Sequence, residues 1–372
     1  MSGNTRNSRN YAIDVIKLIL AVFVFFNHTL DLGHGEVYLS RVLYTADIGW
    51  ISVHYFFVIS GFLMVMSFMR RGARSDSPGR DTASFVWGKF RSIGLEYYVS
   101  FFLAFMVYLA INHQQLSAAF LSNLSFHVLP ELLLINRAGI DTVYINLPTW
   151  YIQCMLLGMV PLYYLLRRHG DLFVRVLAPM GALLGLSFMF RQDNFFIAAK
   201  GCDYLLTNGL IRGMTGILCG ASAYPIYEKL KNADLTKKQR RIFAAAEILL
   251  YIWLFIGCFT AHCDRKGHFL ALLLIPPATA LTFSGAGCSA KLFSSEKWRF
   301  ANALSLTIYF NNWSARRIIE VWFPDMSWLR STVYMTVFTA VLCAAYWIIL
   351  VICRKLWQWK LKEIFTLKPA SE

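Results

Sequence analysis

The sequence predicts an all-α protein, a polytopic membrane bundle of about ten transmembrane helices with both termini in the cytoplasm. Its composition is the first reason: 57% of its 372 residues are hydrophobic and only 15% are charged, too apolar for a soluble globular protein. Apolar runs of about 20 residues, long enough to cross hydrocarbon as helix, recur along the chain. Basic residues also gather in alternate loops, which gives the orientation.

The ten apolar runs lie, in order, at roughly 11–30, 50–69, 93–112, 148–166, 172–190, 204–224, 242–261, 268–285, 301–320 and 331–353. A further apolar stretch, 120–135, is interrupted by Pro130, Glu131 and other polar residues. We therefore expect that stretch to be interfacial or re-entrant. No internal repeat is visible, so residues 1–372 are predicted to form a single membrane domain.

Basic residues set the predicted topology. With the N-terminus inside, 26 of the 36 Lys and Arg residues fall in cytoplasmic segments and nine in outward ones, while Arg212 lies within an apolar run. The cytoplasmic segments include a polar, basic loop at 70–92 and a tail at 354–372. The net charge of +15 is therefore concentrated in the predicted cytoplasmic segments. This distribution indicates contact with membrane lipids rather than with nucleic acid.

The first run is predicted to remain as a membrane anchor, because no signal-peptide cleavage pattern follows the N-terminal residues. The eight cysteines form no CxxC motif. Buried free thiols are expected, with a disulfide between Cys202 and Cys263 as the alternative. The segment 262–268, HCDRKGH, has potential zinc ligands, but their spacing matches no standard site, so no metal is predicted.

The run 11–30 carries a polar stripe. On a helix Asp14, Lys17, His28 and Asp31 fall within roughly 60° of one another, and Lys17 and His28 lie about 16 Å apart along the axis. Ionisable groups at membrane depth are costly and usually face a bundle interior or a wet cavity. The stripe therefore indicates a site, although anchoring at the interface and a hydrogen bond to a neighbouring helix would explain it too.

A basic amphipathic segment precedes the third run. Lys89 and Arg91 alternate there with Phe85, Val86 and Phe90. Such a segment at the cytoplasmic interface suits either lipid phosphates or an anionic cofactor.

Three further features lie within the runs. Arg212 is the only charge on a glycine-rich segment, so it needs an anionic partner from the bundle or a ligand. Trp150 and Tyr151 are predicted to form part of an outward aromatic belt. Ser60-Gly61 is a small pair that permits close helix packing.

In order along the chain, several stretches resemble the integral-membrane acyltransferase family 3, which O-acetylates bacterial surface polysaccharides and peptidoglycan. Asp14 to Lys17, ten residues and His28 are similar to the family's Asp-x-x-Arg and Arg-ten-His motifs. Residues 55–63 resemble its FFxxSGFL signature, and 85–98 its Arg-x-x-Arg segment. The resemblance also covers Trp150-Tyr151, 212–220 and 305–310.

The sequence departs from that pattern in three places. Lys17 replaces an arginine, which keeps the charge but loses the bidentate fork. The Arg-x-x-Arg pair is incomplete around Lys89 and Arg91. Asn311-Asn312 stands where many members have a histidine.

The resemblance implies a multi-pass protein of the bacterial inner membrane that moves an acyl group, most often acetyl, from cytoplasmic acyl-CoA to a hydroxyl of an exported glycan or lipid-linked saccharide, such as O-antigen or exopolysaccharide. Acetyl-CoA would be a co-substrate, without any permanently bound cofactor. A homo-oligomer is left open. A transporter of lipid-linked sugars and a non-catalytic partner in polysaccharide assembly remain as alternatives.

The implied roles fall on nine residues. His28 would act as general base or acyl carrier, and Asp31 would orient it unless it is merely solvated. Lys89 and Arg91 would hold CoA phosphates, and Arg212 a phosphate or a bundle carboxylate. The remaining expected substrate-binding residues are Asp14, Lys17, Trp150 and Tyr309.

Overall fold

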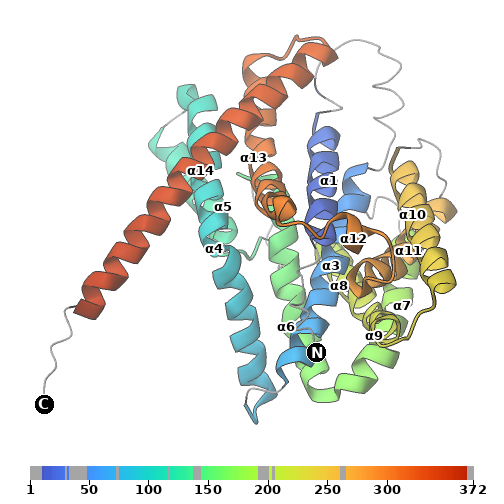
Figure 1. Ribbon diagram of the computed structural model, residues 1–372. Coiled ribbons are helices and arrows are strands. Elements are labelled where there is room, and N and C mark those ends of the chain that lie inside the picture. The colour runs from blue at the N-terminus through green and yellow to red at the C-terminus, as the bar shows by residue number, and fades with distance from the viewer. Residues whose placement is uncertain are drawn as a thin grey trace, which may run out of the picture.

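The computed structural model describes residues 11–29, 32, 48–72, 75–115, 117–136, 144–191, 201–202, 206–259 and 265–366. Over these residues the protein is a bundle of helices, which confirms the all-α class (Figure 1). The helices are α1 (Ala12–Asn27), α3 (Ile48–Arg71), α4 (Pro78–Ile111), α5 (Ala118–Leu132), α6 (Trp150–Leu172), α7 (Ala178–Arg191), α8 (Asn208–Ser222), α9 (Tyr224–Lys231), α10 (Lys237–Phe259), α11 (Arg265–Ser284), α12 (Ser289–Leu292), α13 (Phe300–Trp322) and α14 (Trp328–Thr366). Two-residue strands, β1 (Gly201–Cys202) and β2 (Leu206–Thr207), pair antiparallel before α8.

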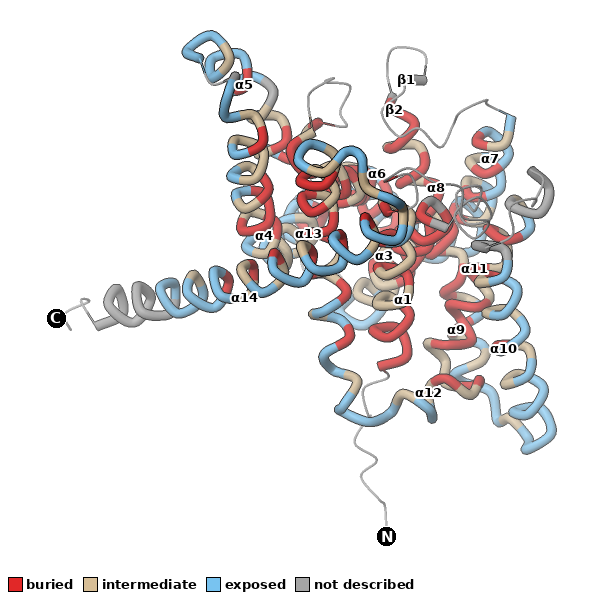
Figure 2. Tube along the Cα trace, turned by 90° about the horizontal axis from the view of Figure 1, so that it is seen from above, coloured by how far each residue is buried: buried red, intermediate tan, exposed pale blue. Residues whose placement is uncertain are grey.

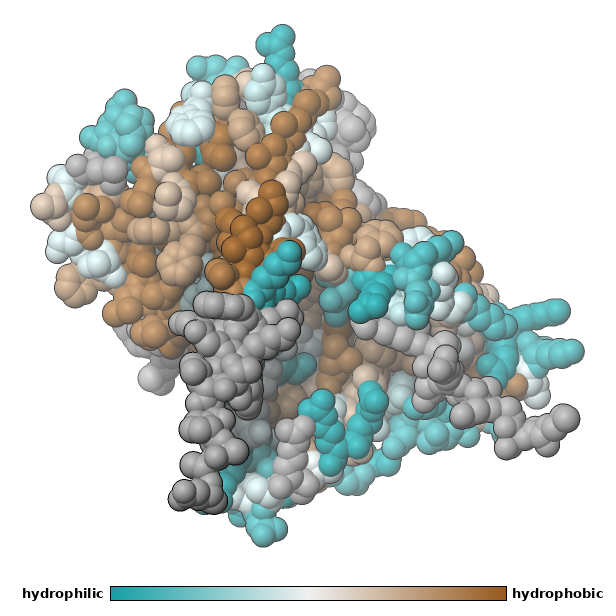
Figure 3. Space-filling view, turned by 60° about the vertical axis from the view of Figure 1, so that its left-hand side comes forward, coloured by the Kyte–Doolittle hydropathy of each residue, from teal (hydrophilic) through white to brown (hydrophobic). Residues whose placement is uncertain are grey.

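Helices occupy all ten predicted apolar runs. Four helical segments are long and apolar enough to cross a membrane, judged on the described residues by length and composition: Ile51–Arg71, Pro78–Ile111, Leu147–Arg191 and Trp328–Trp357. Hydrophobic side chains cover a broad part of the face in Figure 3, as lipid contact requires. The number of crossings and the cytoplasmic position of the termini stay predictions.

Close packing of α3 against α8 forms the centre of the bundle, where buried residues concentrate (Figure 2). A Cβ atom on Gly61 would lie 2.0 Å from the carbonyl oxygen of Ile217, and one on Gly220 would lie 1.9 Å from that of Val58. Glycine is therefore required at both positions, because the two backbones touch there. The predicted packing role of the Ser60-Gly61 pair is confirmed.

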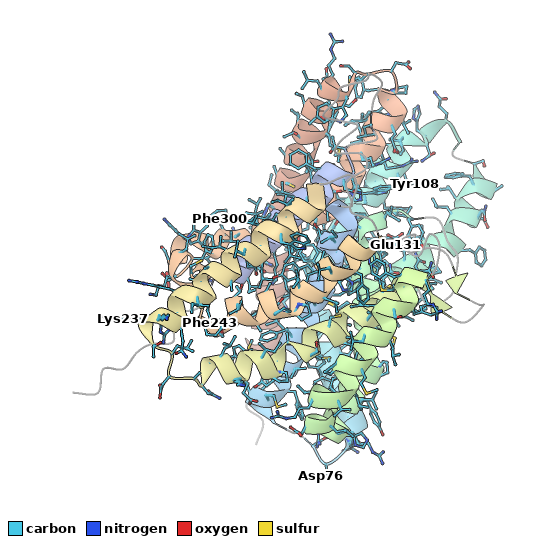
Figure 4. The ribbon with its side chains drawn as sticks, turned by 90° about the vertical axis from the view of Figure 1, so that its right-hand side faces the viewer. Asp76, Tyr108, Glu131, Lys237, Phe243 and Phe300 are labelled. Atoms are coloured by element: carbon cyan, nitrogen blue, oxygen red, sulfur yellow. The ribbon has the colours of Figure 1, made fainter. Side chains whose placement is uncertain are left out.

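Helix α4 begins well inside the predicted loop 70–92. Pro78 starts the helix, where a missing N–H costs nothing, and the Ser77 hydroxyl accepts a hydrogen bond from the Arg80 N–H at 3.4 Å. The loop prediction was therefore too long, since α3 continues to Arg71 and helix resumes at Pro78. Figure 4 shows Asp76, before α4, at one end of the bundle and Tyr108 near the other.

The long helical segment 147–191 bends at His169, whose φ of −131° and ψ of 33° are not helical, and a π-helix at 173–177 follows. Two helices, α6 and α7, therefore match the two predicted runs. The interrupted stretch 120–135 forms α5, with Pro130 inside it. The Glu131 carboxylate accepts hydrogen bonds from the Ile145 and Asn146 N–H groups, which fixes the chain just before α6.

The five cysteines whose side chains are described are free thiols, as predicted: Cys154 and Cys219 are buried, whereas Cys288, Cys343 and Cys353 are only partly buried. The side chains of Cys202 and Cys263 lie outside the described part of the chain.

Candidate active site

The polar stripe of α1 packs against a matching polar face of α13. At one end the Lys17 ammonium donates to the Asn302 Oδ1 atom at 3.3 Å. At the other end the His28 Nδ1 atom lies 2.5 Å from the Asn312 Oδ1 atom. The lower-numbered residues of α1 and α13 meet in one pair and the higher-numbered residues in the other, so the two helices are parallel. The stripe therefore faces a neighbouring helix rather than lipid.

Of this α13 face, sequence reasoning identified only Tyr309 as a site residue and missed the others. Ser305 belongs to it as well, since its hydroxyl donates to the Lys17 carbonyl oxygen at 3.1 Å. The face consists of Asn302, Ser305, Tyr309, Asn312 and Arg316. These spacings of three and four residues are the helical period, so the pattern could have been found in the sequence. In the sequence alone, Asn312 stands out only as a departure from a family motif.

Hydrogen bonds fix the tautomer of His28. The Asn312 amide nitrogen donates to the carbonyl oxygens of Ile308 and Tyr309, both at 2.9 Å. Its Oδ1 atom therefore faces the imidazole as an acceptor, and the His28 Nδ1–H must donate to it. In the neutral ring the lone pair is then on Nε2, which is the nitrogen able to take a proton.

Aromatic and cationic groups surround His28, which is half-buried just beyond the last residue of α1. The Trp313 ring lies edge-on to the imidazole, with centroids 5.3 Å apart. Arg316 donates to the His28 carbonyl oxygen at 3.0 Å and pairs with Glu320 at 2.8 Å. Residues of α13 thus hold the end of α1 through both the imidazole ring and the backbone carbonyl group of His28. Asp31 lies outside the described residues.

A cavity of about 350 Å³ lies next to the Lys17 end of the stripe, and we call it the central cavity. Lys17 of α1 and Lys89 of α4 both line it, so two cationic side chains face the same cavity. Tyr309 lines it too, with its hydroxyl donating to the Pro148 carbonyl oxygen at 2.7 Å. Asp14 is buried and lies 3.9 Å from the Lys17 ammonium.

Tyr151 and Ser60 form another wall of the central cavity, with their hydroxyl oxygens 2.7 Å apart. The predicted outward aromatic belt is therefore wrong for this pair: Tyr151 lines an internal cavity, and Trp150 is 9% exposed. Both face inward because they start α6 beside the aromatic ring of Phe57.

Five predicted site residues in the described part of the chain do not line the central cavity: Asp14, His28, Arg91, Trp150 and Arg212. Arg91 is exposed, since it lies two positions from Lys89 and thus points to the opposite side of α4. Arg212 is 2% exposed, and its guanidinium stacks over the Trp150 ring at 5.4 Å. His28 is outside the lining as well, next to Asn312 and one helical turn of α13 beyond Tyr309 in sequence. Within the described part of the chain, no group of three His, Cys, Asp or Glu side chains could hold a metal ion.

A helical membrane protein with an oriented histidine and an adjacent cationic cavity has the parts that an acyl-transferring enzyme needs. A family model described as "Acyltransferase domain" matches residues 10–354, nearly the whole chain. The protein therefore belongs to acyltransferase family 3, and the matched segment includes the α1 stripe, the α13 face and the central cavity. No match was found among curated proteins or among solved structures.

Proposed function

We propose that this protein is an O-acyltransferase that moves an acyl group, most often acetyl, from cytoplasmic acyl-CoA to a hydroxyl of an exported or lipid-linked glycan in a bacterial inner membrane. The observation that carries the proposal is the His28–Asn312 hydrogen bond. It leaves the imidazole in the tautomer that a general base requires, with Nε2 as the proton acceptor.

In the proposed reaction, Nε2 of His28 takes the proton of the sugar hydroxyl while that oxygen attacks the thioester carbonyl carbon. The new C–O ester bond forms and the C–S bond breaks, and the thiolate of CoA leaves with the proton that His28 had taken. Transient acylation of Nε2 is the alternative route to the same products. Asn312 orients the ring in either route, the role that the sequence had suggested for Asp31.

The donor would enter through the central cavity. Lys17 and Lys89 offer positive charge on the side where the basic residues predict the cytoplasm. Lys17 and His28 are separated by eleven residues of α1, or about 16 Å. The extended pantetheine arm of CoA can bridge that distance, passing Tyr309, which lies three residues from Asn312 on α13.

The direct test is acyl transfer in membranes that contain the protein, with labelled acetyl-CoA as donor and the glycan of the source cell as acceptor. Labelled glycan should appear with wild-type membranes and be absent with His28→Ala membranes of matched protein abundance. Transport would be indicated instead if acyl-CoA had no effect and lipid-linked sugar accumulated on the inner side when the gene is deleted.

A further inference from the structure

Two more cavities adjoin the central cavity, one beyond each of its lysines. Beyond Lys89 lies a small one of about 240 Å³, with Arg71 in its lining. Beyond Lys17 lies a larger one of about 870 Å³, lined by residues of α1, α3, α9, α11, α12 and α13. We call the larger one the α9 cavity. Lys17, Leu63 and Asn302 line both it and the central cavity, so these two cavities meet at Lys17.

The α9 cavity combines cations with aromatic rings. Arg70 lines it from the end of α3 and Lys231 from the end of α9. The Lys231 ammonium donates to the Tyr227 hydroxyl at 3.0 Å and lies 5.5 Å from the centroid of the same ring. Tyr224 lines the cavity beside Tyr227, with their centroids 5.5 Å apart. Such a set suits a planar base and phosphates in one ligand.

Acidic groups in the α9 cavity already have cations near them. Asp14 lies 3.9 Å from the Lys17 ammonium, and Glu228 lies 4.0 Å from Arg175. Arg70 and Lys231 are exposed, at helix ends where an anion can reach them. A polyanion can therefore gain charge-assisted hydrogen bonds there.

The cavity sizes decide which part of a donor each could hold. The central cavity, at about 350 Å³, is lined largely by apolar and aromatic side chains such as Phe56, Ile59 and Leu306. It suits the slender arm that carries the thioester. The α9 cavity is more than twice as large and more polar, so it has room for a bulkier and more highly charged group. The cavity beyond Lys89 is smaller than the central one.

We propose that the α9 cavity binds the nucleotide end of the acyl-CoA donor, with Arg70 and Lys231 on its phosphates and Tyr224 and Tyr227 against the adenine. Lys17 then stands at the neck, where the pantetheine arm enters the central cavity. This assignment rests on the proposed function. It differs from the expectation drawn from the sequence, which gave the phosphates to Lys89 and Arg91.

The test uses the full-length protein in membranes and two donors, acetyl-CoA and acetyl-pantetheine, which lacks the nucleotide. In the double variant Arg70→Glu/Lys231→Glu, the KM for acetyl-CoA should rise at least tenfold with kcat within about twofold of wild type. Transfer from acetyl-pantetheine, slower in wild type, should be the same in the variant. Adenosine 3′,5′-bisphosphate should compete with acetyl-CoA in wild type and not in the variant.

Two cationic residues close to Lys231 and Arg70 in the sequence provide charge-reversal controls for the double variant. Lys229→Glu, on the same turn of α9 as Lys231 but outside the α9 cavity lining, should leave the KM for acetyl-CoA unchanged. Arg71→Glu tests the smaller cavity beyond Lys89. A tenfold rise in KM for Arg71→Glu, with none for the double variant, would overturn the inference while the proposed function stood. A wild-type protein that transfers from neither donor would remove the proposed function itself.

Discussion

The two ends of the α1 stripe are built differently. At the His28 end, two hydrogen bonds to the backbone of α13 hold the Asn312 side chain, which orients the oxygen that accepts from His28 Nδ1. At the Lys17 end, long cationic side chains border cavities, and the Lys17 ammonium lies 3.9 Å from the Asp14 carboxylate. A rigid end suits proton transfer, whereas an adaptable end suits binding of a flexible polyanion.

The largest effect is expected at the rigid end. His28→Gln keeps a hydrogen-bonding group but cannot take a proton, so transfer should fall by about 10²–10⁴-fold, as for His28→Ala. Expression and thermal stability should stay near wild type, because His28 is only half-buried. The assay is transfer to the native glycan at matched protein abundance. Full activity in His28→Gln would mean that His28 only packs.

Asn312 should come next. Asn312→Leu removes the acceptor that holds Nδ1–H, so kcat should fall by about 10–100-fold with little change in the KM for acyl-CoA. Asn311→Leu is the control: Asn311 is also buried and bonds its own helix, to the Thr307 carbonyl oxygen at 2.8 Å. Equal losses in both variants would trace the effect to folding of α13 rather than to the imidazole.

At the adaptable end we expect smaller effects on binding. Lys17→Arg should retain activity because it restores the residue more usual in the family, whereas Lys17→Ala should raise the KM for acyl-CoA about tenfold. Steady-state kinetics in membranes measures both. A Lys17→Ala variant with lower kcat and unchanged KM would assign Lys17 to the chemical step instead.

Charge reversals at Lys89 and Arg91 give a more specific test of the central cavity. The two residues lie in the same segment and carry the same charge, but they face opposite sides of α4. Lys89→Glu should raise the KM for acyl-CoA several-fold, since it reverses a charge in the central cavity. Arg91→Glu should change it by less than twofold. If the two reversals acted equally, a general effect of the basic surface, such as lipid contact, would explain them better than the cavity does.

The smallest effect is expected for the ion pair between Arg354 of α14 and Glu96, at 2.6 Å. The Arg354 side chain is 47% exposed, so solvent weakens the pair, and Arg354→Ala should cost less than about 1 kcal/mol. A thermal melt in detergent would measure this, with activity expected within twofold of wild type. Glu96 also lines the central cavity, so a large loss of activity would mean that its charge must be neutralised there.

Helix positions could be predicted well from the sequence, because the length and polarity of an apolar run depend only on local residues. Helix α4 is the exception: its first four turns are amphipathic and contain two glycines, and they are helical because Ser77 and Pro78 start them and Asp81 pairs with Arg167 at 2.6 Å. That ion pair joins residues 86 positions apart, so no local pattern reveals it.

For the site, the sequence by itself determined which residues share the α1 stripe, because the 3.6-residue period fixes the side of a helix on which a residue lies. It also determined the family, through an ordered set of motifs. Only the tertiary structure decided that α13 is the neighbour of that stripe, that Asn312 orients His28, and that Lys89 rather than Arg91 reaches the cavity. The reason is that periodicity defines a face of one helix, whereas contacts depend on which helices pack together over long sequence separations.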